Sequence, residues 1–539
     1  MLHNDFHEAP TLRSTSSQFS FARPIDPDAL GLAEDAIERL LHERAEAIAT
    51  IDEFEGMNHP DAWCPLRLLA LAVLQSRYGV SEREAIRRAR RDLAWRYALR
   101  LGPSDATPSR SVFQRFLAGL RERHGEDFVH RRCLRLAQQE GLVEDAELQA
   151  IDSTNTDCRG AILDTFNLVA RGIGNLLRRI ADWTGEPVDE LAERLWATDY
   201  LQRSIKSAVA IDWSSKDEHI GLMTRLVNDA LRLVTAMRDP GTMKLAPPAD
   251  VVDAVELLRR VALQDVEQLP DGRWKIKRGT ARGRVVSISD PQASHGRKSG
   301  AKKITGYKTH VLATVDGAFV TAVLITDAGT HDSIPSAELI RQAEAVGMAP
   351  TRVLGDLAYG TGQNRRTLND MGVTILTKVG RDGRAAIPKS AFNIDLAAGR
   401  VTCPQGQTTE QYTLVKAGKG SDERVRNYKF DKKLCAACPL ADKCNSATRK
   451  GRARTVKLNV FEPELQAAKA FNASPDAKPL LRKRCGVERV ISHLMRYGLR
   501  AARYFGQGMT QFQAYMTSAA YNLQRVATLL AARERAASG

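Results

Sequence analysis

The sequence predicts an α/β core with acidic residues on two different strands, preceded by an all-helical region. Apart from a helical stretch after residue 157, the core pattern reads strand, β-hairpin, helix, strand, helix, strand. Asp152 lies on the first of these strands, and Asp356 ends a later one. Before residue 140, apolar residues recur at helical spacing. A chain of 539 residues is too long for a single core, so we expect about two to four domains.

The composition is that of a globular protein with a basic surplus. Lys and Arg outnumber Asp and Glu by 79 to 64, a net charge of +15, which favours nucleic acid over acidic metabolites as a partner. No window approaches about 18 uninterrupted apolar residues, and the polar N-terminus lacks the apolar core of a signal peptide. We therefore expect a cytoplasmic protein without a membrane segment.

Residues 28–140 are predicted to form a helical DNA-binding domain after a flexible arm over residues 1–27. Two consecutive helices, the second beginning after Ser81, make a helix-turn-helix candidate. The second helix carries a cluster of four arginines: Arg87, Arg88, Arg90 and Arg91. These residues either contact DNA or form a solvated charged face.

Local signals indicate where these helices begin. Ser81 with Glu84 three residues later is a capping box, and a helix over about residues 82–100 follows without a breaker. Thr107 and Pro108 are expected to start the next helix, with Thr107 as its N-cap.

Two insertions divide the α/β core. The expected segments are a first strand in 145–157, a helical insert in 158–270, the continued core in 280–382, a cysteine-containing insert in 383–460 and C-terminal helices in 475–535. The helical insert contains no chemical motif. Within the last segment, residues 480–504 read as an Arg-rich helix with one acid, Glu488.

Four of the eight cysteines have spacing typical of a metal site. Cys435, Cys438 and Cys444 read C-x2-C-P-x4-C, and Cys403 lies upstream. Tetrahedral zinc is bound by four such ligands on tight turns, so we expect a structural Zn²⁺ site. The alternative is a set of unrelated reduced thiols.

The acids have two interpretations each. Asp356 either ends a buried strand as a turn residue or serves as a catalytic group, because catalytic groups cluster at strand ends in open α/β sheets. Glu488 is either a salt-bridge member on a solvated face or a third metal ligand. His331 and Asp332 are expected to cap the helix that follows them rather than to act in catalysis.

Asp152 in "AIDST", Asp356 in "GDLAYGT" and Glu488 on an Arg-rich helix together resemble the acids of DDE transposases from bacterial insertion sequences. The chain is similar to the group whose third-acid segment reads Tyr-x2-Arg-x3-Glu-x6-Lys, and within it to the insertion-sequence family numbered eleven-eighty-two. Arg484 and Glu488 keep the x3 spacing. The Tyr position is Leu481, and the Lys position is Met495, with Arg496 directly after it.

The resemblance implies an RNase-H-like catalytic core, a mixed sheet with flanking helices. It implies that Asp152, Asp356 and Glu488 hold two Mg²⁺ (or Mn²⁺) ions, with Asp152 bridging both. Arg484, Arg496 and Lys308 of "GYKTH" are expected to contact double-stranded DNA, at the element ends and the target. The protein is expected to act as a homodimer when assembled on DNA.

The predicted function is therefore a transposase that binds the ends of its insertion sequence, cleaves DNA with metal-activated water and joins the 3′-OH ends to target DNA. Two alternatives share parts of this sequence pattern. One is a transposase-derived DNA-binding repressor, against which the complete set of acids argues. The other is an RNase-H-like nuclease that never joins ends.

Overall fold

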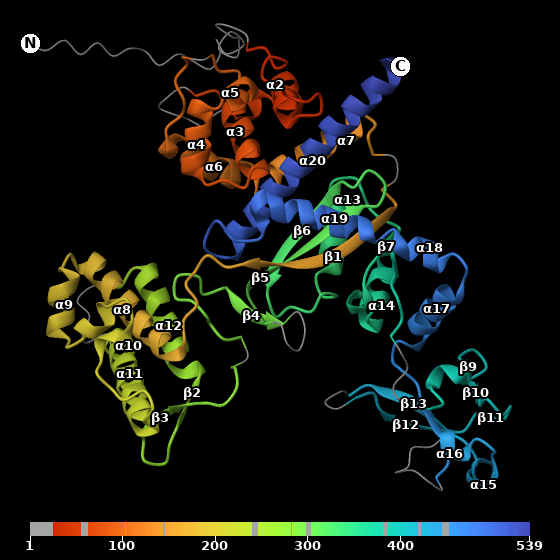
Figure 1. Cartoon of the computed structure of the whole chain (residues 1–539). Coiled ribbons are helices and arrows are strands. Elements are labelled where there is room, and N and C mark those ends of the chain that lie inside the picture. The colour runs from red at the N-terminus through yellow and green to blue at the C-terminus, as the bar shows by residue number, and fades with distance from the viewer. Residues whose placement is uncertain are drawn as a thin grey trace, which may run out of the picture.

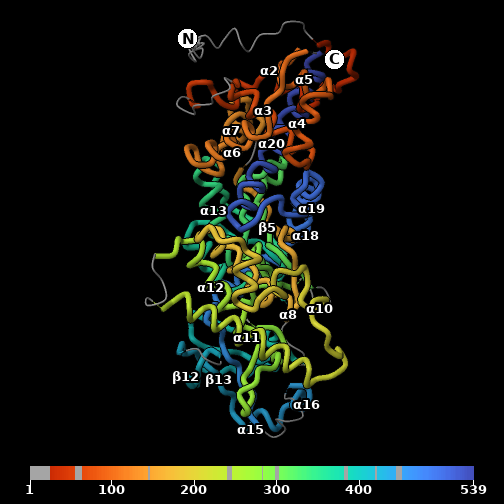
Figure 2. The backbone as a smooth tube through the Cα atoms, turned by 90° about the vertical axis from the view of Figure 1, so that its left-hand side faces the viewer, coloured from red at the N-terminus to blue at the C-terminus, as the bar shows by residue number. Residues whose placement is uncertain are grey.

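The computed structural model describes residues 25–54, 63–102, 104–143, 146–239, 246–281, 283–297, 303–380, 386–418, 422–444 and 452–538. Most of the predicted N-terminal arm, residues 1–24, lies outside the described residues. The molecule is elongated: the N-terminal helices lie at one end, a central sheet in the middle and the cysteine-containing segment at the other end (Figure 2).

The central sheet has six strands in the order β4-β5-β1-β7-β8, with β6 also paired to β5. Its strands are β1 (Leu148–Asp157), β4 (Ser294–Arg297), β5 (Lys303–Thr314), β6 (Val320–Asp327), β7 (Arg352–Leu354) and β8 (Thr374–Leu376). β1 runs antiparallel to β5 and parallel to β7, which in turn is parallel to β8. This mixed sheet with flanking helices fits an RNase-H-like core.

Alternating side chains of the strands supply two separate hydrophobic cores, as the two-residue period of a strand requires. Ile151 and Leu312 pack on one face with helices α13 (Ser336–Ala345) and α14 (Gly362–Asp370). Their neighbours Ala150 and Val311 belong to the larger core on the other face, which includes the C-terminal helix α20 (Gln507–Ser538).

The N-terminal helices form a layer that α20 joins to the sheet, since α20 packs on both α3 and β6 (Figure 1). They are α2 (Ile37–Ile48), the 3₁₀ turn η2 (Ile51–Phe54), α3 (Pro65–Arg77), α4 (Glu82–Arg91), α5 (Leu93–Ala98), α6 (Arg110–His124) and α7 (Phe128–Gln139). The predicted capping box is confirmed, because the Ser81 hydroxyl accepts a hydrogen bond from the Glu84 N–H at 3.3 Å.

Two helix predictions in this layer are wrong. The expected helix over residues 82–100 is broken at Asp92, which has extended backbone and whose carboxylate accepts from the N–H groups of Ala94 and Trp95, capping a new helix. The helix expected to start at Thr107 begins later, because Ser109 caps it by accepting from the Val112 N–H. In both cases a short polar side chain competes for backbone donors.

The helices between β1 and β4 have a core of their own, and they lie to one side of the sheet (Figure 1). The elements are α8 (Thr165–Thr184), α9 (Val188–Arg194), η3 (Thr198–Leu201), α10 (Ile205–Ala208), α11 (Lys216–Ala236), α12 (Ala249–Gln264), and the hairpin β2 (Val266–Gln268) with β3 (Trp274–Ile276).

The cysteine-containing segment consists of two small three-stranded sheets and short helices. Its elements are η5 (Lys389–Ala391), β9 (Asn393–Asp395), β10 (Arg400–Thr402), β11 (Thr408–Thr409), β12 (Tyr412–Lys416), β13 (Arg424–Lys429), α15 (Lys432–Ala436), α16 (Ala441–Cys444) and β14 (Thr455–Lys457).

The predicted Arg-rich helix over residues 480–504 is also wrong as one unit. The structure has α17 (Glu462–Ala473), α18 (Ala477–Arg482), α19 (Cys485–Leu494) and a π-helical turn η7 (Met495–Leu499). Gly498 has φ +98, a left-handed conformation that glycine adopts without strain and that ends the helical run. None of the helices in the described ranges is long and apolar enough to cross a membrane.

Candidate active site

Asp152 and Asp356 lie at the same edge of the central sheet. The last paired residues of the parallel strands β1 and β7 are Ala150 and Leu354, and each aspartate follows its partnered residue by two positions. Neighbouring strands are about 4.8 Å apart, so this register brings the two carboxylates to adjacent positions. A parallel pair thus explains why an acid follows the apolar run of β7.

Each aspartate has one oxygen engaged by nearby backbone. Asp152 Oδ1 accepts from the Ser153 N–H at 2.8 Å. Asp356 Oδ1 accepts from the Ala358 N–H at 2.8 Å and thereby caps the 3₁₀ turn η4 (Leu357–Tyr359). Asp356 is therefore the turn residue that the simpler sequence interpretation expects, and it also lies beside Asp152.

Glu488 reaches this edge from α19, and Arg484 connects it to Asp152. The Arg484 guanidinium donates to Asp152 Oδ2 at 3.0 Å and to Glu488 Oε1 at 2.5 Å. Arg484 and Asp152 are largely covered, with 25% and 19% of their side chains exposed, whereas Glu488 is 53% exposed. One cation thus links the first acid to the third, which are far apart in sequence.

The electrostatics of Asp152 reflect this crowding. Burial raises the pKa of Asp152, and the carboxylates of Asp356 and Glu488 raise it further, while the Ser153 N–H and the Arg484 guanidinium lower it. Negative charge at three converging carboxylates is unfavourable without a cation nearby, and here the Arg484 guanidinium provides part of that positive charge.

A second network lies directly behind Asp152, and sequence reasoning missed it. Asp332 accepts from the Ser153 hydroxyl at 2.9 Å and pairs with the Lys308 ammonium at 3.1 Å. The expected capping role of His331 and Asp332 is wrong, since α13 begins at Ser336 without a side-chain cap. The sequence places a hydroxyl, that of Ser153, directly after Asp152. It does not show which side chain that hydroxyl contacts.

Of the other residues with a predicted DNA contact, Lys308 lies in the network beside Asp152, whereas the α4 arginines and Arg496 lie on other elements. The Lys308 side chain is only 12% exposed, and its ammonium also donates to the Thr330 carbonyl oxygen at 2.6 Å. Arg87 and Arg88 on α4 pair with Glu84 at 2.7 and 3.1 Å. Of the four α4 arginines with a predicted DNA contact, three are exposed, namely Arg87, Arg90 and Arg91. Arg496 is exposed on η7.

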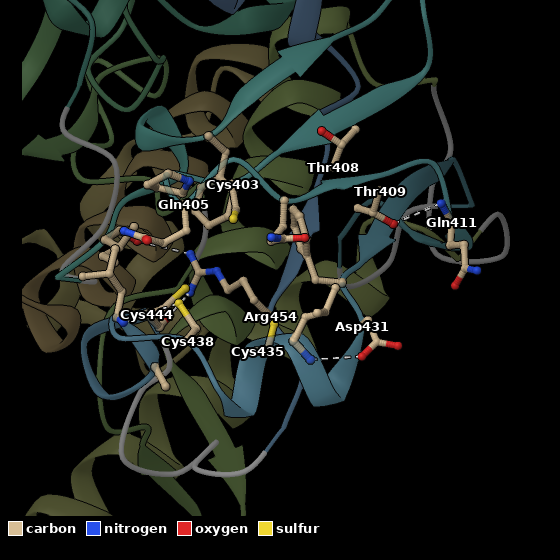
Figure 3. Close-up of a pocket in the computed structure, with 18 of the residues that line it drawn as sticks. Cys403, Gln405, Thr408, Thr409, Gln411, Asp431, Cys435, Cys438, Cys444 and Arg454 are labelled. Carbon is tan, nitrogen blue, oxygen red and sulfur yellow. Dashed lines mark hydrogen bonds between the residues drawn. The ribbon is translucent and has the colours of Figure 1, made fainter.

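The four cysteines line one cavity of 460 Å³ (Figure 3). Cys403 follows β10 in a turn, Cys435 lies in α15, Cys438 in the next turn, and Cys444 ends α16. Cys438 Sγ accepts from the Leu440 N–H at 3.4 Å.

Arg454 lines the same cavity as the cysteines, and its guanidinium donates to the Cys444 carbonyl oxygen at 2.6 Å. Burial raises the pKa of the Cys444 thiol, Arg454 partly opposes this shift, and the other three cysteines raise the pKa further. The cavity thus offers four soft donors beside one guanidinium.

Neither cluster is arranged as a closed metal site in this conformation. Within the described part of the chain, no three side chains of His, Cys, Asp or Glu are positioned to hold a metal ion as they stand. The donor chemistry nevertheless fits, with hard carboxylates around a cation at one site and four thiols around a shared cavity at the other.

The mixed sheet with flanking helices fits an RNase-H-like core, and the acids lie together beside that sheet. Residues 402–527 match the transposase DDE domain, and residues 31–118 match the transposase domain known as DUF772. No curated protein and no solved structure matches the chain. Together, these two matches indicate a DDE transposase of an insertion sequence.

The DDE domain makes the protein a DNA-cleaving and strand-transferring enzyme that depends on a divalent metal and acts on DNA. Its matched range includes Glu488 and all four cysteines.

Proposed function

We propose that Asp152, Asp356 and Glu488 form the catalytic centre of this transposase and hold two Mg²⁺ (or Mn²⁺) ions. The observation that carries the proposal is the convergence of the acids around one cation, the Arg484 guanidinium, which contacts two of them. When bound, the divalent ions activate water and stabilise charge on the attacking and leaving oxygens of the phosphodiester.

The three acids are proposed to have different roles, which follow from their positions. Asp152 lies beside Asp356 and is more covered than Glu488, so it would contribute to holding both ions, while Asp356 and Glu488 would each hold one. Attack by water oxygen on phosphorus breaks the bond to O3′ and leaves a 3′-OH and a 5′-phosphate. The same 3′-OH then attacks a phosphodiester of the target DNA.

The proposal includes a change of partner for Arg484. Its guanidinium lies one helical turn from Glu488 and can donate two charge-assisted hydrogen bonds to a phosphate. With divalent ions held by the acids, the Arg484 guanidinium would be available to a DNA phosphate. Arg87, Arg88, Arg90 and Arg91 on α4 supply further phosphate contacts in this proposal, as do Arg496 and Lys308.

We also propose a structural Zn²⁺ bound by Cys403, Cys435, Cys438 and Cys444. Two thiols from the short helices α15 and α16 and two from turns line one cavity, and four thiolate ligands leave no open position for chemistry. The role is therefore folding of the cysteine-containing segment.

Because two element ends have to be joined together, we propose that two copies of the chain assemble on DNA. Arg484 and Glu488 support membership of the insertion-sequence family numbered eleven-eighty-two.

One assay tests the chemistry. Purified protein is incubated with labelled element ends, a target plasmid and Mg²⁺. We expect labelled ends joined to the plasmid. Cut but unjoined ends would identify a nuclease, and bound but intact ends would identify a repressor.

A further inference from the structure

A second cavity, of 390 Å³, lies where the N-terminal helices meet the C-terminal helices. Its wall comes from α3, the α19–η7 region and α20, and α20 packs on both other elements (Figure 1). The side chains that define it are cationic and aromatic: Arg77, His493, Arg496, Tyr497, Tyr521 and Arg525. None of the three proposed catalytic acids lines this cavity.

The three guanidinium groups have neutral partners only. Arg77 Nε donates to Gln524 Oε1 at 3.2 Å. Arg496 Nη2 lies 3.0 Å from His493 Nδ1, and Arg525 Nε donates to the Gly317 carbonyl oxygen at 3.1 Å. Within the described ranges, none of these arginines has a carboxylate partner. Each is thus oriented by one hydrogen bond and keeps other donors free for a ligand.

The cavity carries concentrated positive charge. Burial lowers the pKa of His493, and the charges of Arg496, Arg77 and Arg525 lower it further, so three cations act on one imidazole. Two carboxylates lie near the cavity: Glu38 accepts from the Tyr78 hydroxyl at 2.5 Å, and Asp35 accepts at 3.4 Å from Thr528, which lines the cavity. Like charges around a cavity repel one another, and a bound anion would relieve this repulsion.

The backbone around the cavity is fixed by a close approach of two glycines. A Cβ on Gly79 would lie 3.0 Å from the carbonyl carbon of Tyr497, and one on Gly498 would lie 2.9 Å from the Gly79 Cα. Both glycines have positive φ. This contact places the end of α3 against η7, with the Arg77 guanidinium 4.4 Å from the centre of the Tyr497 ring. The donors are therefore preorganised.

We propose that this cavity binds a phosphate group, and that the bound phosphate fastens the N-terminal helices to the C-terminal helices. Guanidinium forks match phosphate oxygens, and the Tyr497 and Tyr521 rings, each only 5% exposed, form the wall behind them. Arg496 follows Glu488 by eight residues, or about 12 Å along a helix. One DNA strand has a phosphate every ~3.4 Å, so the strand at the acids is a suitable source.

A free phosphorylated compound has the same chemistry, so the test has two arms, both without divalent metal. The first titrates element-end DNA across a salt series with wild type, Arg77→Gln, Arg525→Gln and the control Arg535→Gln. Arg535 lies on the same helix but pairs with Glu34 at 2.9 Å. For a DNA phosphate we expect each pocket variant to reduce the magnitude of the log affinity against log salt slope by about one. The control should leave the slope unchanged.

The second arm measures thermal unfolding in inorganic phosphate against chloride at equal ionic strength. For a free phosphate compound we expect a rise in melting temperature for wild type that both Gln variants lose, with an unchanged DNA slope. Arg77→Lys and Arg525→Lys keep the charge, and circular dichroism reports whether the Gln variants fold. Unchanged slopes together with no phosphate-dependent rise would overturn the proposal, as would an equal loss of slope in Arg535→Gln.

Neither arm measures cleavage. The result therefore does not depend on whether Asp152, Asp356 and Glu488 are catalytic.

Discussion

The carboxylate cluster and the cysteine cavity both gather metal-binding residues from distant segments, but they stand on very different frameworks. Asp152 lies on a ten-residue strand that is paired on both sides within the central sheet. Cys435 and Cys444 lie on helices of five and four residues. The buried core under the cysteines has five residues: Phe392, Val401, Tyr428, Phe430 and Val456.

The two sites differ in what stabilises them when no metal ion is bound. The carboxylates have an internal counter-charge, Arg484, and their framework is stabilised by large cores on both faces of the sheet. The cysteine-containing segment has too small a core to be stable alone, so metal binding is expected to supply folding free energy there. Metal should thus decide activity at the first site and folding at the second.

The largest effect is expected from the acids. Asp152→Ala, Asp356→Ala or Glu488→Ala should each reduce strand cleavage by about 10³-fold or more, because several kcal/mol of charge stabilisation are lost. End binding should stay nearly intact, since basic residues hold the phosphates. Cleavage of labelled ends is the measurement, with Asp316→Ala in the β5–β6 hairpin as the control. Wild-type cleavage by one of the three variants would remove that residue from the catalytic centre.

The second prediction concerns zinc. Elemental analysis of protein purified without added metal should give about one zinc per chain, and Cys435→Ser should lose it. Limited proteolysis should then cut the variant between residues 386 and 457, while the central sheet keeps its melting temperature. Cys133→Ser, at a buried cysteine outside the cavity, is the control for zinc content. Zinc-free protein that resists proteolysis there would refute the assignment.

The third prediction concerns how the stability of the framework around the central sheet depends on pH. Burial lowers the pKa of His130 on α7 to about 4, and its Nε2 lies 2.9 Å from the Val320 carbonyl oxygen of β6. The unfolded chain binds this proton at pH 6.5, so stability is lost as the pH falls from about 6.5 to about 4, by about 3 kcal/mol. Chemical unfolding across this range should show the loss, and His130→Gln should reduce it. If added zinc restored the stability that is lost at low pH, the loss would instead arise in the cysteine-containing segment.

The smallest effect is expected at Arg484. If its guanidinium moves to a DNA phosphate, Arg484→Ala should reduce the magnitude of the salt slope of end binding by about one in the presence of divalent metal. If it remains a salt bridge on α19, the slope should stay and stability should fall by about 0.3 to 0.5 kcal/mol. A salt series with Arg484→Lys as the charge-preserving control distinguishes the two.

Local signals were the easiest to predict from sequence. The Ser81 and Glu84 pair fixes a helix start because one hydroxyl and one backbone donor decide it. The same kind of interaction defeated the longer helix prediction at Asp92, since periodicity continues through a residue that can either stay in a helix or cap a new one. The residue pattern alone does not show which of these two states has the lower free energy.

The amino-acid sequence by itself determined the strand-borne acids, the cysteine spacing and the basic charge, because each depends on residue type and on neighbours a few positions away. Tertiary structure alone decided that Arg484 bridges Asp152 and Glu488, that Asp332 lies behind Ser153, and that three arginines share a cavity with His493. Two of these contacts, Ser153 with Asp332 and Asp152 with Arg484, join residues that are 179 and 332 positions apart. Their geometry follows from how the sheet and helices pack, and no local pattern of apolar and polar residues encodes it.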